Sequence, residues 1–116
     1  MKLSKSRSAM LVLASAIALV AAPAMAASAN HIVDVTLKDH KFSPDKIEVP
    51  AGKPFKIRLK NVDKSADEFD SDDLRVEKVV GGGKTSIIRV QALKPGTYKF
   101  MGEYHSATAR GVVIAK

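Results

Sequence analysis

Few side chains in this sequence could perform chemistry, and those that could suit a metal ion. They are three histidines, a run of acidic residues and one methionine near the C-terminus: His31, His40, His105, Glu68, Glu103, the other acids of residues 67–73, and Met101. Imidazole and carboxylate ligands together suit copper(II), iron and zinc. The chain has no cysteine, which excludes a thiolate ligand and a cysteine nucleophile. It also lacks a nucleophile elbow and a phosphate-binding loop.

Glu68 and His105 are two positions that could supply a metal ligand. Glu68 and Asp70 flank Phe69. If Phe69 lies on a strand and its side chain enters the core, the side chains of both neighbours point to the opposite face of the sheet. His105 follows a predicted strand over residues 97–101. The alternatives are a solvated acidic loop and an ordinary surface histidine, and spacing alone leaves both open.

The N-terminal segment has the pattern of a secretory signal peptide. Basic residues precede an apolar run over residues 10–22, and Ala24-Met25-Ala26 resembles a cleavage site. We therefore predict a signal peptide over residues 1–26 and one exported, periplasmic domain over residues 27–116. The alternative is an uncleaved membrane anchor, but the apolar run is too short for this, so no stable membrane insertion is expected.

The composition of the predicted domain narrows its partners. Three of the 19 basic residues lie in the signal peptide, which leaves 16 against 12 acidic residues and a net charge of +4. The basic residues are spread along the chain, which suits solvated strand faces and does not favour nucleic-acid binding. An exported domain without cysteine has no disulfides. Packing alone, or packing aided by a bound metal, must therefore hold the fold.

Hydrophobic and polar residues alternate with a period of two along most of the domain, which is typical of half-buried strands. The clearest case is Phe55, Ile57 and Leu59, which alternate with basic residues. Six to eight short strands predict an all-β antiparallel sandwich or barrel, interrupted by the polar, acid-rich residues 61–77. The run L-K-P-G-T-Y predicts a corner at which the Tyr98 hydroxyl bonds to the backbone a few residues upstream.

Two stretches at opposite ends of the domain resemble the cupredoxin family. F-S-P-D-K-I-E-V-P-A-G-K-P-F-K-I-R-L-K-N resembles its opening strands, and L-K-P-G-T-Y-K-F-M-G-E-Y-H resembles its last hairpin and ligand loop. In this order, behind a signal peptide, the motifs make nearly the whole of residues 27–116 similar to a cupredoxin. The resemblance implies a Greek-key β-sandwich of about six to eight strands.

The same resemblance implies which positions form the metal site. The family takes one histidine from the loop after the Asn-ended strand. It takes a cysteine, a second histidine and often a methionine from the C-terminal loop. These positions fall on Glu68, Gly102 and His105, and no methionine lies within residues 106–111. A blue copper centre is therefore excluded, because its thiolate bond cannot form.

In place of that centre, the resemblance implies a site made of His40, Glu68, Glu103 and His105. His40 lies in the loop that borders the ligand histidine in the cupredoxin fold, and Glu103 lies beside the position of the lost cysteine. Two imidazoles and two carboxylates suit a copper(II) ion or an iron ion. Asp70 and Met101 are outside candidates.

The pattern as a whole resembles a cysteine-free cupredoxin subgroup. Its members are small periplasmic proteins associated with Ftr-type iron permeases, and they are similar to the cupredoxin domain of the EfeO iron-uptake proteins. The resemblance implies an iron permease and other periplasmic iron-uptake components as partners. It implies a role in binding ferrous iron, or in oxidising it before transport with copper as redox partner.

Two other classes of function stay open. A stand-alone ferroxidase is not favoured, because one mononuclear site has no second copper through which to pass four electrons to oxygen. A metal-free β-sandwich could serve as an interaction module with a degenerate copper site. Glu68 and the retained His105 argue against this second class, since a dead site would be expected to carry apolar or random residues.

Overall fold

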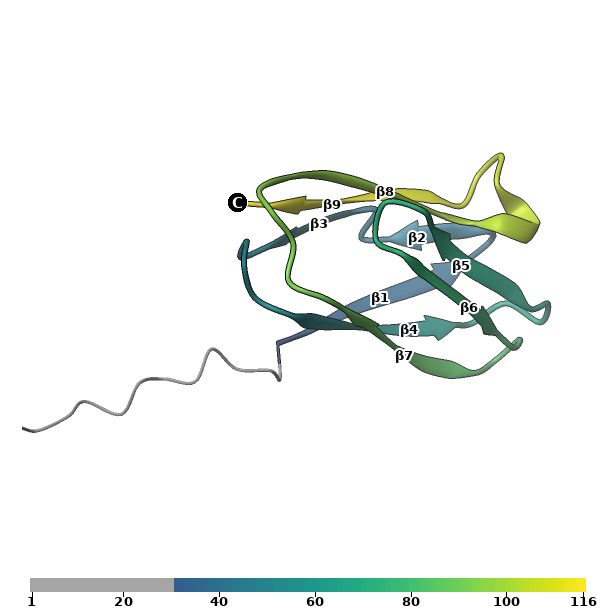
Figure 1. The fold of residues 1–116 in the computed structure, drawn as a ribbon. Helices are drawn as coiled ribbons and strands as arrows, with labels where there is room; N and C mark the ends of the chain where they lie inside the picture. The colour runs from purple at the N-terminus through teal and green to yellow at the C-terminus, as the bar shows by residue number, and fades with distance from the viewer. Residues whose placement is uncertain (1–30) are drawn as a thin grey trace, which may run out of the picture.

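The fold was analysed in a computed structural model, which describes residues 31–116 (Figure 1). The predicted signal peptide over residues 1–26 and the predicted domain boundary at residue 27 lie outside this range. The described chain is almost entirely β-structure, with nine strands and one 3-10 turn. Among residues 31–116, no helix has both the length and the apolar composition needed to cross a bilayer.

The strands form two sheets, and the first has four strands in the order β2-β1-β4-β7. Its strands are β1 (Ile32–Lys38), β2 (Lys41–Ser43), β4 (Phe55–Asn61) and β7 (Thr85–Val90). β1 runs parallel to β4, whereas β1 with β2 and β4 with β7 are antiparallel. The first sheet is therefore mixed.

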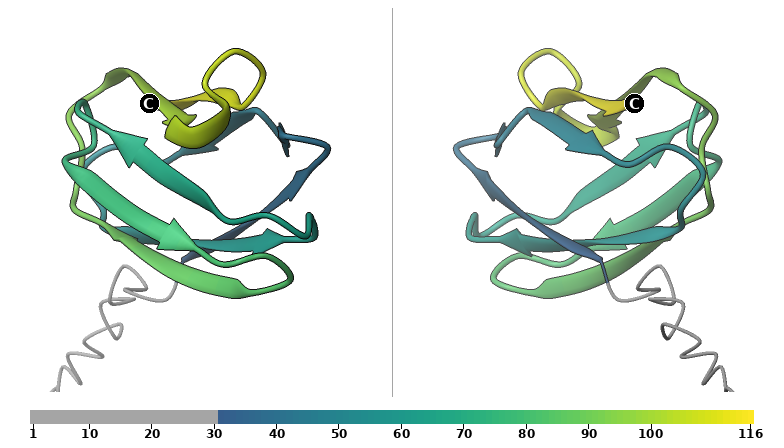
Figure 2. Two further views of the ribbon diagram at one scale, coloured as in Figure 1. Left: turned by 90° about the vertical axis from the view of Figure 1, so that its right-hand side faces the viewer. Right: turned by 90° about the vertical axis from the view of Figure 1, so that its left-hand side faces the viewer.

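The second sheet has five strands in the order β3-β9-β8-β5-β6. Its strands are β3 (Lys46–Val49), β5 (Asp67–Ser71), β6 (Val76–Val80), β8 (Gly96–Gly102) and β9 (Arg110–Ala115). β3 runs parallel to β9, and the other neighbours are antiparallel. The 3-10 turn η1 (Glu103–His105) follows β8 directly. Figure 2 shows the two sheets as facing layers.

The core lies between the layers and is built from the inward side of each alternating strand. On β4, Phe55, Ile57 and Leu59 are at most 2% exposed, which the period of two predicts. Phe69 on β5 and Phe100 on β8 stack with their ring centroids 5.0 Å apart, and Phe42 on β2 meets both rings edge-on. This aromatic group joins the two sheets beneath the end of the sandwich that carries η1.

The predicted all-β sandwich is confirmed, with nine strands within residues 31–116 in place of the expected six to eight, and the structure corrects two further details of it. Two of the strand pairs are parallel, not antiparallel, because β2 and β3 carry the chain from one sheet to the other between β1 and β4. The acid-rich interruption also contains strand β5 and the start of β6. Periodicity missed β5 because Phe69 is its one large apolar side chain, flanked on the inward face by Asp67 and Ser71.

The predicted tyrosine corner is confirmed. The Tyr98 hydroxyl donates a hydrogen bond of 2.7 Å to the backbone oxygen of Lys94, four residues upstream. This bond fixes the arch through which the chain leaves one sheet and enters β8 in the other.

Asn61, at the end of β4, organises the opposite end of the sandwich. Its side chain is fully buried and its amide donates to the backbone oxygens of Ser65, Val80 and Gly81 at 2.9–3.3 Å. Its amide oxygen accepts from the backbone N–H of Asp63 at 3.1 Å. The buried Asn61 side chain therefore links the end of β4 to the loop before β5 and to the β6–β7 connection. It also positions the backbone of Asp63.

Figure 1 shows η1 and the loop after it at the end of the sandwich opposite the C-terminus. The two-residue turn between β1 and β2, which contains His40, lies at this same end, where His40 stacks on His105. The candidate ligands therefore gather at one end and on the adjoining face of the second sheet.

Candidate metal centre

Asp67 is the buried carboxylate around which this end of the sandwich is organised. The residue is 2% exposed. Its Oδ1 accepts hydrogen bonds from the backbone N–H groups of Glu68 at 2.8 Å and Tyr104 at 3.1 Å. Its Oδ2 lies 3.0 Å from Nδ1 of His105. Since an ionised carboxylate can only accept, Nδ1 carries the hydrogen, and Nε2 of a neutral His105 keeps its lone pair for a ligand.

Gly102 makes room for this carboxylate. A Cβ atom at position 102 would lie 2.5 Å from Oδ2 of Asp67 and 2.8 Å from Cβ of Ala109. Gly102 is the position that the resemblance assigns to the copper-ligating cysteine. An internal carboxylate therefore occupies the space that a cysteine side chain would need, and a blue copper ion does not fit this arrangement.

His40 is positioned by a strained but well-anchored turn. Asp39 and His40 form the two-residue connection between β1 and β2, and both have positive φ, of 52° and 57°. Such a turn matches the twist of the flanking strands, although it usually carries glycine. The Asp63 carboxylate accepts from the backbone N–H groups of both residues, at 2.8 and 3.0 Å. The N–H of His40 is the main reason that the pKa of Asp63 is lowered.

The structure brings the two predicted imidazoles together as a stack. The rings of His40 and His105 lie with centroids 3.5 Å apart and planes 14° from parallel. The lone pairs of a ring nitrogen lie in the ring plane, so nearly parallel rings cannot both point at one ion between them. In this arrangement each imidazole presents its own ligand position, and their joint role in one site stays a prediction.

The predicted carboxylates belong to a second group, which we call the carboxylate cluster: Glu68, Asp70, Glu77 and Glu103. One oxygen from each lies within 4.8 Å of the others. Glu68 and Asp70 share the outward side of β5, because Phe69 between them is buried. Glu77 lies directly opposite Asp70 on β6, and Glu103 reaches the cluster from η1. Oxygen atoms alone, in this number, suit a hard or borderline cation.

The carboxylates of the cluster repel one another. The pKa of Glu77 is raised, first because its carboxyl group can share its proton with Glu68, and then by repulsion from Glu68 and Asp70. The pKa of Glu103 is raised in the same way, first by a shared proton with Asp70. Like charges opposite each other on neighbouring strands destabilise a sheet. A bound cation would remove this repulsion.

One oxygen of Glu68 lacks a partner. Its Oε1 is buried and has no hydrogen bond within the described range. The neighbouring phenol of Tyr104 has a raised pKa, first because of partial desolvation and then because of the negative charge of Glu68. A buried carboxylate oxygen without a donor is costly, and a metal ion is a partner that could satisfy it.

The two groups of ligands are separate but share two chain segments. Asp67 and Glu68 are consecutive on β5, and they face opposite sides of the sheet. Glu103 and His105 both lie on η1. The sequence predicts Glu68, Glu103, His40 and His105 as ligands, with Asp70 as an outside candidate. It does not predict Glu77, and it does not single out Asp67. Glu77 could have been found only from its register opposite Asp70.

We predict that Gly102→Ala displaces the Asp67 carboxylate from His105. The added Cβ would overlap Oδ2 of Asp67 and Cβ of Ala109, so one of them must move. We expect a loss of about 1–3 kcal/mol in the free energy of unfolding and a change in the ¹⁵N shifts of the His105 ring. Gly81→Ala is the matched control, because its Cβ would meet only the flexible Lys84 side chain, at 3.2 Å. Unchanged His105 shifts in Gly102→Ala would contradict the prediction.

A second prediction concerns the pH dependence of the metal-free protein. Because the pKa values of Glu77 and Glu103 are raised in the fold, their ionisation destabilises the native state as pH rises through those values. The double variant Glu77→Gln/Glu103→Gln should therefore have a higher urea midpoint than the unsubstituted protein at about pH 7. The difference should vanish at about pH 3, well below the ordinary pKa of a glutamate (about 4.3), where both side chains are protonated in the folded and the unfolded states. Equal midpoints at both pH values would show that the carboxylates do not repel.

Comparison with known protein families agrees with this architecture. The family model for the cupredoxin-like domain matches residues 9–115. An uncharacterized protein of Rickettsia prowazekii is 40% identical over 82 residues. The match covers 71% of this chain and 66% of that protein, so it spans slightly less than two thirds of the relative.

Solved structures with the same fold include copper proteins. The metal-binding domain of the Cu(I)-exporting ATPase CopA of Streptococcus pneumoniae has a TM-score of 0.68 at 14% identity, over 77% of this chain and 88% of that one. Auracyanin A, a blue copper protein of Chloroflexus aurantiacus, has a TM-score of 0.66 at 16% identity, over 75% of this chain and 99% of that one. With the family match over nearly its full length, this chain belongs to the cupredoxin-like domain family.

Proposed function

We propose that this protein is a periplasmic metal-binding cupredoxin that assists iron uptake through an iron permease. Its cargo is ferrous iron, which the carboxylate cluster would hold. The observation that carries the proposal is the convergence of four carboxylates, none of which forms an ion pair within residues 31–116, together with the partnerless Oε1 of Glu68. The cluster costs stability in the absence of metal, and a divalent cation is the ligand that would offset this cost.

A copper ion would need a different set of donors. The thiolate geometry of a blue copper centre does not fit, because the Asp67 carboxylate fills the space beside Gly102. Copper(II) accepts imidazole and carboxylate ligands, and the free Nε2 of His105, next to His40, is the imidazole that could serve it. When bound, copper would supply one-electron redox chemistry. His105 would hold it, and Asp67 would keep the ring oriented.

The place of this protein in iron uptake rests on resemblance. Its pattern is similar to that of cupredoxins associated with Ftr-type permeases and of the EfeO domain. Two structural neighbours, the CopA domain and auracyanin A, are copper proteins, which supports metal binding by this fold. The exposed position of Glu77 and Glu103 suits the release of an ion to a partner, since a fully enclosed ion would be slow to leave.

A metal-free interaction module is the second candidate function. The ring stack and the hydrogen bonds of Asp67 would then serve only to stabilise the loop after β8. This candidate does not account for the mutual repulsion within the carboxylate cluster. Stand-alone ferroxidase turnover is not part of the proposal, because it would require an electron acceptor beyond one metal ion.

Calorimetric titration with Fe²⁺ under anaerobic conditions, and separately with Cu²⁺, tests the metal site. We expect Glu68→Gln to weaken Fe²⁺ binding at least tenfold, because the buried oxygen loses its charge. We expect His105→Ala to weaken Cu²⁺ binding more than Fe²⁺ binding. Glu48→Gln is the matched control, since Glu48 lies on β3 of the same sheet and pairs with Lys116. Absence of binding of both metals would favour the metal-free module, and unchanged binding in Glu68→Gln and His105→Ala would overturn the assignment of the site.

Iron uptake by cells tests the role in transport. Cells that lack this protein should accumulate ⁵⁵Fe more slowly at low external iron than cells that contain it. The unsubstituted gene should restore uptake, and so should Glu48→Gln, whereas Glu68→Gln should not. Equal uptake with and without the protein would overturn the transport role, even if the purified protein binds iron.

A further inference from the structure

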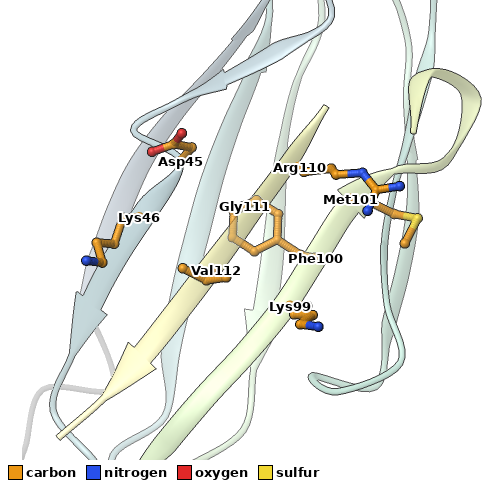
Figure 3. Close-up of a pocket in the computed structure, with 8 residues that line it drawn as sticks. All are labelled: Asp45, Lys46, Lys99, Phe100, Met101, Arg110, Gly111 and Val112. Carbon is orange, nitrogen blue, oxygen red and sulfur yellow. The ribbon is translucent and has the colours of Figure 1, made fainter. Parts of the chain in front are cut away.

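A groove of about 560 Å³ lies on the outer face of the second sheet, beside the carboxylate cluster. It is lined by parts of β3, β8 and β9: Asp45, Lys46, Lys99, Phe100, Met101, Arg110, Gly111 and Val112. Figure 3 shows Lys46 and Lys99 on opposite sides of β9, with Val112 between them. The proposed metal site does not use this groove.

The strand register places the positive charges around one apolar position. Val112 pairs with Lys46 on β3 and with Lys99 on β8, so the three side chains form a row on the outward face. Neighbouring strands lie about 4.8 Å apart, so the lysine backbones are about 10 Å apart and their ammonium groups can reach one ligand above Val112. Arg110 lies two residues before Val112 on the same face of β9.

These cations are not neutralised by the protein. Lys46, Lys99 and Arg110 take part in no ion pair within residues 31–116. Arg110 donates only its Nε, to the backbone oxygen of Ser106, which leaves its two terminal nitrogens for a ligand. Asp45 is the one carboxylate among the lining residues, so within the lining three positive charges stand against one negative charge. Outside the lining, the Asp73 carboxylate accepts from the backbone N–H of Lys99 at 2.8 Å.

The floor of the groove is apolar. Val112 and Met101 are half-buried, and the alkyl stems of the two lysines extend this surface. A simple inorganic anion would leave these carbon atoms in contact with water. A ligand with a short carbon skeleton would cover them and present its charges to the surrounding cations.

We propose that this groove binds a short-chain organic anion that carries two or three carboxylates. Each carboxylate would accept hydrogen bonds from Lys46, Lys99 or the terminal nitrogens of Arg110, and the carbon skeleton would lie on Val112 and Met101. The site is distinct from the carboxylate cluster and does not require a metal ion. On the same face, however, one cross-strand row contains Arg110, Met101, Asp70 and Glu77. The two sites are therefore neighbours.

The test is a titration of the metal-free, ¹⁵N-labelled protein with tricarballylate, followed by NMR. We expect saturable shift changes at the amides of Lys46, Lys99, Arg110 and Val112. The double variant Lys46→Gln/Lys99→Gln should bind at least tenfold more weakly, because two of the three cations are lost. Inorganic phosphate should bind more weakly than tricarballylate, because it leaves the apolar floor exposed.

The matched control is Lys60→Gln/Arg89→Gln, which removes two positive charges from exposed positions on the other sheet. This variant should bind tricarballylate as the unsubstituted protein does. Equal weakening in both double variants would show that overall charge attracts the anion, and it would overturn the site. The absence of saturable shifts in the unsubstituted protein, or tighter binding of phosphate, would overturn the proposal as well. A negative result in this titration would not bear on the proposed metal site, because the titration uses the metal-free protein.

Discussion

The arrangement of the candidate site depends on one buried carboxylate. Asp67 is held by the backbone N–H groups of Glu68 and Tyr104 and by the ring of His105, as a buried charge requires. It joins β5 to the turn after β8 and orients the imidazole. This is sterically permitted only because position 102 has no side chain. The glycine at position 102, where the resemblance expects a cysteine, and the buried aspartate at position 67 are therefore sterically linked, because a side chain at position 102 would overlap the carboxylate.

The outer face of the second sheet is organised by charge. The carboxylate cluster lies at the β5–β6 side, where one residue pair sets Asp70 directly against Glu77. Unpaired basic residues lie at the β3–β9 side, and the half-buried Met101 lies between the two regions. Neither region is explained by stability, because like charges on neighbouring strands repel.

The fold could be predicted wherever the hydrophobic alternation was strong. Strand β4 and the tyrosine corner at Tyr98 were predicted from local patterns, and the sandwich followed from them. Strand β5 was missed, because its inward face contains Asp67 and Ser71 beside Phe69. Several of the hydrogen bonds that satisfy these polar groups join them to Lys99, Tyr104 and His105, which are distant in the sequence, so no local pattern could reveal that they are buried. The parallel pairs were missed for a similar reason, since sheet order is decided by long-range packing.

The sequence by itself determined the chemistry that is available at this site. With no cysteine in the chain, it excluded a thiolate ligand and left carboxylates, imidazoles and the Met101 thioether as the candidate donors. Only the tertiary structure decided how these donors are grouped. Strand alternation turns Asp67 inward and Glu68 outward, and register brings Glu77 to Asp70. The β1–β2 turn, whose backbone N–H groups bond to Asp63, stacks the ring of His40 on the ring of His105. These groupings depend on contacts between residues far apart in the chain, which spacing along the sequence does not encode.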